Sequence, residues 1–143
     1  MQKRRLWVWN LLLGFTITVC VLAFVSHSKN WIKLKDGHMR ILSGFYIKTL
    51  DFTELDSVEM IDKLPPMIRL NGFSAFDKGK GIYREFKDSL TEKKVYVFID
   101  NFANPKIRLV KKDADQLFLN LKDSLETAQL FEFFKAKASA DQR

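Results

Sequence analysis

Cysteine, histidine and proline are scarce in this sequence, and their scarcity excludes several classes of protein. A single cysteine, Cys20, cannot form a disulfide bond within the chain, so a disulfide-stabilised fold is excluded. The only histidines, His27 and His38, show no metal-ligand spacing, so we expect neither a metal nor a cofactor. Few prolines, no low-complexity tract and no internal repeat predict one folded domain outside any membrane segment.

Acidic residues are also in the minority, with 17 Asp and Glu against 24 Lys and Arg and a net charge of +7. The basic excess is spread along the chain without long blocks of one sign, which predicts no nucleic-acid partner but is compatible with weak attraction to anionic lipid. Carboxylates gather at Glu54, Asp56 and Glu59, and again at Asp113 and Asp115. Turn chemistry and surface solvation explain both groups, so we expect no catalytic residue and no enzyme.

What the sequence does contain is a run of twenty residues, Leu6 to Val25, without a side chain that is charged at neutral pH. A helix of that length covers about 30 Å, which is the hydrocarbon thickness of a bilayer. Trp7 and Trp9 lie at one end of the run and Trp31 lies just beyond the other, where amphipathic rings favour the headgroup level. The sequence therefore predicts a single membrane-spanning helix and a bilayer partner. The predicted divisions are a basic tail at 1–5, the span at 6–25, a linker at 26–30 and a domain at 31–143.

Two processed forms are alternatives to a retained helix. A cleaved secretory signal would place its cleavage site at Ser26-His27-Ser28, although the apolar run is longer than the about 7–15 residues typical of such signals. A lipid-modified Cys20 would need a small residue before it, and Val19 stands there. We expect the helix to be retained, and cleavage stays open.

Basic residues flank the predicted span on both sides, so its orientation is weakly specified. Lys3, Arg4 and Arg5 precede it, and four more basic residues follow it: Lys29, Lys33, Lys35 and Arg40. A first helix behind a basic start usually keeps its amino end in the cytoplasm. We therefore expect a single-pass protein of the cell membrane with an extracytoplasmic domain.

Hydrophobic alternation between turn residues dominates the middle of the chain and predicts about seven antiparallel strands in a mainly β fold. Asp36-Gly37 favours a tight hairpin, and Ser43-Gly44 a second reversal. Val95 to Ile99 is apolar on both faces, which favours a central strand. The strand-like segments lie at 31–35, 38–42, 45–50, 55–61, 67–70, 82–86, 95–99, 107–110 and 117–121.

A helix is predicted at about 124–137, where the hydrophobic period changes from two to that of a helix. Asp123 can cap its first turn, with Glu126 three residues later. Leu130 and Phe134 place a broad apolar side on this helix, which must lie on another surface. We expect that surface to be the open end of a curved sheet and the chain after the helix to fray.

Three segments together resemble a bacterial pleckstrin-homology-like (PH-like) domain found in small membrane proteins. They are LPPMIRLNGF at 64–73, KGKGIYR at 78–84 and LFLNLKD at 117–123, and the resemblance covers about residues 34–136. It implies a roll or partly open barrel plugged by a carboxy-terminal helix, in a membrane-tethered setting. Similar proteins often carry paired helices before the domain, and this chain has one.

The resemblance implies no activity, because members of that group are largely uncharacterised. In phosphoinositide-binding PH domains, several cations in a roomy loop surround the headgroup phosphates. The corresponding turn here, Asp36-Gly37 or Ser43-Gly44, has no room for them. Inositol lipid binding is therefore not predicted from the fold.

The candidate binding site is the glycine-rich segment from Asn71 to Arg84. Its cations Lys78, Lys80 and Arg84, with Arg69 just before it, could bind an anion or a lipid headgroup. Glycines let backbone amides approach an anion closely. The alternative is structural, because Gly72, Gly79 and Gly81 also permit bends in a long hairpin.

We therefore predict a non-enzymatic, membrane-anchored interaction module that binds an unknown protein or envelope partner at the membrane. The alternative function is electrostatic binding of anionic lipid headgroups by the basic face of the domain. An enzyme would need a buried pair of titrating groups, which the sequence does not indicate.

Overall fold

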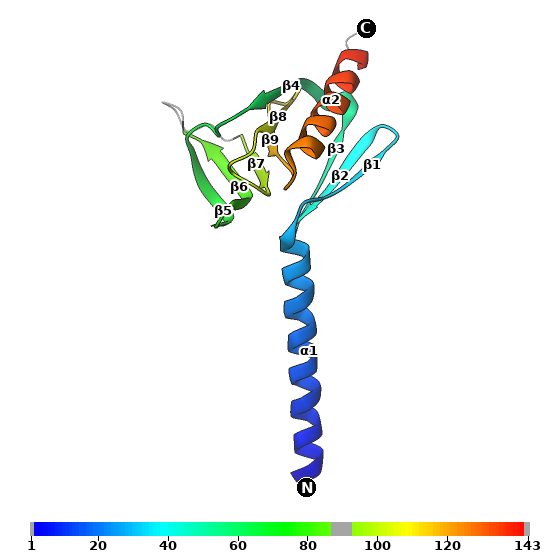
Figure 1. The fold of residues 1–143 in the computed structure, drawn as a ribbon, viewed down its shortest axis with the longest axis vertical. Coiled ribbons are helices and arrows are strands. Elements are labelled where there is room, and N and C mark those ends of the chain that lie inside the picture. Colours follow the sequence, from blue (N-terminus) through cyan, green and yellow to red (C-terminus); the bar gives the residue numbers. More distant parts are fainter. Residues whose placement is uncertain (1, 87–92, 142–143) are drawn as a thin grey trace.

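A long amino-terminal helix projects from a β domain in the computed structural model of this chain, which describes residues 2–86 and 93–141 (Figure 1). The helix, α1 (Gln2–Ser28), is followed by nine strands, a short 3-10 helix η1 (Phe52–Glu54) and the carboxy-terminal helix α2 (Ser124–Asp141). The free ends of the two helices point in opposite directions (Figure 1).

Helix α1 is long and apolar enough to cross a membrane between Arg5 and Ser28. The β domain does not cover the side chains of this helix: the large apolar residues from Leu6 to Val25 are about half exposed or more. An apolar helix without protein cover is expected where lipid surrounds it. The structure is therefore consistent with a single-pass membrane protein, and the helix continues three residues beyond the end predicted at Val25.

The first three strands form a small antiparallel sheet directly after α1. They are β1 (Trp31–Lys35), β2 (His38–Ser43) and β3 (Tyr46–Asp51). Gly37, with φ of +90°, lies in the first turn as the Asp36-Gly37 pair predicts, and Gly44, with φ of +62°, lies in the second. Both values fall where glycine escapes the Cβ clash that other residues meet.

The other six strands form a second sheet in the order β4-β8-β9-β7-β6-β5. Of the five neighbouring pairs among these described strands, one is parallel, β7 with β9. After β7 the chain forms β8, and it then returns as β9, which lies between β8 and β7. Strand β7 is internal, as its two apolar faces predict. The strands are β4 (Leu55–Ile61), β5 (Met67–Ala75), β6 (Lys78–Glu85), β7 (Val95–Ile99), β8 (Lys106–Lys111) and β9 (Gln116–Leu119).

The prediction of about seven strands, all antiparallel, is wrong. All nine strand-like segments of the sequence form strands, one pair is parallel, and the described strands close no barrel. Alternation reports that a segment is half buried, but the partner and its direction depend on distant residues. The mainly β class with a terminal apolar helix and a carboxy-terminal helix is confirmed.

The main core lies between the small sheet, the large sheet and α2. Phe134 of α2 is fully buried in this core, which also contains Ile41 of the small sheet and Phe98 of the large sheet. The predicted cap is confirmed, because the Asp123 carboxylate accepts hydrogen bonds from the N–H groups of Leu125 and Glu126, at 2.7 and 3.2 Å. The chain does not fray after residue 137 but stays helical to Asp141. A second core lies on the other face of the large sheet, around Phe118.

Candidate functional site

The last turn of α1 is attached to the β domain by both backbone and side-chain contacts. The Gly44 N–H donates to the Ser26 carbonyl at 3.1 Å, and the Lys78 ammonium donates to the Ser28 carbonyl. The carboxy-terminal end of a helix leaves carbonyls without partners and carries partial negative charge, so an amide and a cation are suitable partners there. The His27 ring packs against Phe45 and Phe73, with centroid distances of 4.5 and 5.2 Å.

Asn30, two residues after α1, connects this helix end to three parts of the domain. Its N–H donates to Asp100 Oδ2 at 2.6 Å, and its side-chain amide donates to the Phe98 carbonyl at 2.7 Å and the Asn120 carbonyl at 2.8 Å. Its amide oxygen accepts from the Ser43 hydroxyl at 2.5 Å. Asn30 is buried, so each of these bonds replaces water that cannot reach it.

A buried ion pair lies beside Asn30. Lys80 Nζ stands 3.1 Å from Asp100 Oδ1, and the two side chains are 0% and 1% exposed. Burial lowers the pKa of Lys80 from its ordinary value, and the attraction of Asp100 opposes that shift. Removing one partner of such a buried pair strongly destabilises the folded protein, because the other charge stays buried without compensation.

Asn120 completes the arrangement at the ends of β7 and β9. Its side-chain oxygen accepts from the N–H groups of Asp100 and Asn101 at 2.9 and 3.2 Å. We refer to Asn30, Ser43, Lys80, Asp100 and Asn120 as the junction. Through the junction, the chain two residues after α1 is buried in the domain and bonded to both sheets.

The structure does not bring the four predicted cations together. On β6, Lys78, Lys80 and Arg84 share one face because strand side chains alternate, whereas Arg69 pairs across the sheet with Tyr83 and so lies on the other face. Burial raises the pKa of Tyr83, and the nearby Arg69 charge opposes that shift. Lys80 is enclosed with Asp100, and Lys78 is engaged at the end of α1.

The glycines near these cations lie inside the β5 and β6 hairpin, in agreement with their structural interpretation. Gly72, with φ of +122°, pairs with Gly81 of β6, directly after a bulge in β5 between Arg69 and Asn71. A Cβ at Gly72 would lie 2.2 Å from the Lys80 carbonyl oxygen, so only glycine fits this close approach of strands.

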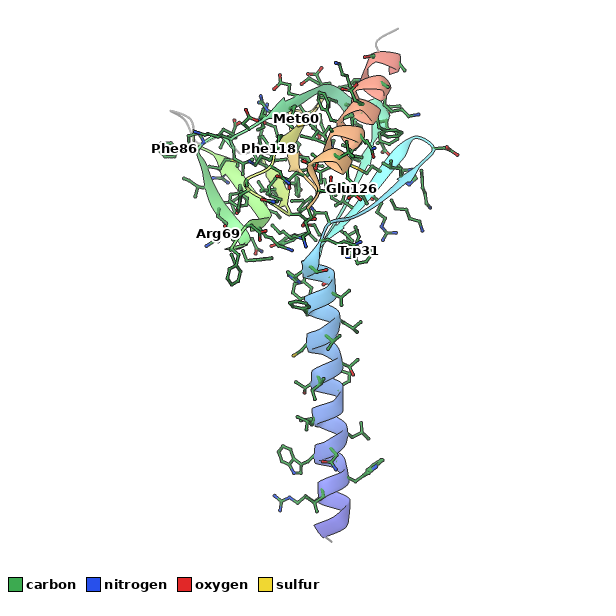
Figure 2. All side chains as sticks on the ribbon, viewed as in Figure 1. Trp31, Met60, Arg69, Phe86, Phe118 and Glu126 are labelled. Atoms are coloured by element: carbon green, nitrogen blue, oxygen red, sulfur yellow. The ribbon has the colours of Figure 1, made fainter. Side chains whose placement is uncertain are left out.

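An open groove lies on the outer face of the small sheet, next to α1. Its volume is about 450 Å³, and its lining residues are Trp31, Ile32, Lys33, Arg40, Leu42 and Ile47. The register places Trp31, Leu42 and Ile47 in one row and Lys33 and Arg40 in the next. Figure 2 shows Trp31 immediately above the end of α1, and the Lys29 ammonium lies 4.2 Å from the Trp31 ring centre.

Sequence reasoning did not identify the junction or the groove. The sequence signal for the junction was a polar residue directly after an apolar strand segment. Asp100 follows Val95 to Ile99, and Asn120 follows the apolar residues 117–119. The groove arises only when three strands align Trp31 with Leu42 and Ile47.

No group of three or more His, Cys, Asp or Glu residues within 2–86 and 93–141 could hold a metal ion. His27 lies at the end of α1 and His38 at the start of β2. Comparisons with protein-family models, with curated proteins and with solved structures found no match.

Proposed function

We propose that this chain is a non-enzymatic, single-pass membrane protein that holds a PH-like interaction module beside the bilayer and binds a protein or envelope partner there. The observation that carries the proposal is the junction. Since Asn30 bonds to Phe98, Asp100 and Asn120 within two residues of α1, the domain has one preferred position relative to the helix. The resemblance of the three sequence segments to bacterial PH-like domains supports the same setting.

The groove on the small sheet is the surface we assign to the partner. Its apolar row can take up apolar side chains, and its basic row favours carboxylates next to them. The partner is accordingly a membrane-associated protein segment in which apolar and acidic residues are adjacent. The groove begins three residues after α1, so such a segment binds close to the membrane surface.

A site-specific crosslinking experiment tests this proposal. A photoreactive amino acid replaces Ile47 in the groove or, as the control, Leu125, an equally bare residue on α2. We expect the full chain in native membranes to give a discrete protein adduct from position 47 only. Arg40→Glu should abolish that adduct, because it reverses the charge that attracts the carboxylates. Equal adducts from both positions, or an adduct insensitive to Arg40→Glu, would contradict the proposal.

Anionic lipid headgroups are the second candidate for the basic face, and one observation favours them. Lys29, Lys33 and Arg40 surround an apolar row that lies immediately beyond a helix of membrane length. Juxtamembrane cations of this kind attract anionic lipid by about 1 kcal/mol each and lose that attraction at high salt. Lipid adducts from position 47 that disappear at high salt, without a protein adduct, would identify this candidate instead.

A further inference from the structure

We propose that the base of the β domain inserts two exposed phenylalanines, Phe45 and Phe76, into the headgroup layer of the bilayer that α1 crosses. This inference rests on the proposed membrane span but goes beyond it. It describes a second contact with lipid, made by the domain, on loops outside the groove. The occupant of the surface is the lipid interface itself.

Phe76 is the first of the two residues that connect β5 to β6, since Ala75 and Lys78 are the last paired residues of that hairpin. Its side chain is fully exposed, and its φ is +55°. Left-handed backbone is costly for residues other than glycine, and bulky residues rarely adopt it. A bare aromatic ring at a position suited to glycine contributes nothing to the core, and such strain points to a role outside the folded chain.

Phe45 occupies the turn between β2 and β3 and is 75% exposed. It follows Gly44, whose N–H is bonded to the Ser26 carbonyl, and its ring packs against His27. The turn is thus fixed to the last turn of α1, and the phenylalanine lies where that helix would leave the lipid.

The hairpin that carries Phe76 is fixed to the same helix end. Lys78 donates to the Ser28 carbonyl and Phe73 packs against His27, so residues just before and just after the tip contact α1. Figure 1 shows the turn between β5 and β6 at the height of the upper end of α1, on the other side from the small sheet. Phe45, Phe76 and Trp31 therefore surround the point where a helix of membrane length ends.

Amphipathic tryptophan and tyrosine rings are enriched at this level of membrane proteins, and membrane-bound surfaces bury phenylalanine at the boundary between headgroups and acyl chains. The opposite end of the same hairpin provides the contrast. Phe86 is also exposed, at 64%, but Figure 2 shows it at the far end of β6, away from α1. The two ends of one hairpin thus offer similar side chains at different heights above the membrane.

Depth-dependent fluorescence quenching tests the inference. With Cys20→Ala to remove the native thiol, the single variants Phe45→Cys, Phe76→Cys and Phe86→Cys each carry the same polarity-sensitive dye. The full chain is reconstituted in vesicles of phosphatidylcholine and phosphatidylglycerol that contain lipids with nitroxides at the headgroup or high on the acyl chain. We expect a blue shift and strong quenching at positions 45 and 76, and neither at position 86.

Each outcome separates this inference from the proposed membrane span. Alkaline extraction of the same samples reports whether α1 holds the chain in the bilayer. A chain that resists extraction but shows no quenching at 45 or at 76 overturns the inference and leaves the span intact. Equal quenching at 86 also overturns it, since the dye would then reach lipid from any exposed position. A chain released by alkali contradicts the span and, with it, the second contact.

Discussion

Replacing Asp100 with alanine should reduce the free energy of unfolding of the β domain by about 3–5 kcal/mol, because it leaves Lys80 buried without its counterion. Asp100 is the only anion that the described residues place on Lys80 Nζ, and it also accepts the Asn30 N–H. The loss would be read from denaturant unfolding of the full chain in detergent micelles, followed by the circular dichroism of the sheets.

Two further variants identify the cause of that loss. Adding Lys80→Met to Asp100→Ala removes the uncompensated charge and should recover a large part of the stability. Glu59→Ala, which breaks a half-exposed pair with Arg108 at the same kind of distance, 3.0 Å, should cost less than about 1 kcal/mol. The account of the junction is wrong if Asp100→Ala is as mild as Glu59→Ala, or if Lys80→Met brings no recovery.

Introducing two aspartates in the middle of α1, Leu13→Asp with Ile17→Asp, should release the chain from membranes. Each acidic side chain at the centre of a spanning helix costs about 2.5–3.5 kcal/mol of insertion free energy. The two positions lie one turn apart on a helix that is bare of protein contacts, so no part of the domain compensates them. The measurement is the fraction of chain that stays with the membrane after alkaline extraction.

Leu125→Asp is the matched control for the two aspartates, because Leu125 is as exposed as the residues of α1 but belongs to the β domain. This variant should stay in the membrane like the unaltered chain. If the variant with two aspartates resists extraction equally well, α1 does not cross the bilayer.

Local patterns in the sequence predicted the elements of the fold better than their arrangement. The uncharged run predicted a helix that could span a membrane, Asp36-Gly37 predicted a turn, and Asp123 predicted the start of α2. These three features depend on residues that are neighbours in the chain, and a single sequence shows such local patterns directly. The parallel pairing of β7 with β9 depends on where β8 lies, and no local pattern records it.

The candidate site was harder to predict, for the same reason. Lys80 was expected to face an anion from solution, but its partner is Asp100, twenty residues further along the chain and directly after the neighbouring strand β7. Asn30 and Asn120 are ordinary polar residues in the sequence and become important only when β6, β7 and β9 meet the end of α1. Long-range polar contacts of this kind leave no periodic signal.

The central claim is that the junction holds the β domain in one position relative to α1, and a distance measurement in lipid tests it most directly. Spin labels on the native Cys20 of α1 and on Leu125→Cys of α2 report the separation of the two parts in lipid nanodiscs. We predict a single narrow distance distribution that broadens when Asn30→Gly removes the side-chain bonds of the junction. A broad distribution in the chain with Asn30 intact would show that the domain moves freely on its helix, and it would contradict the account.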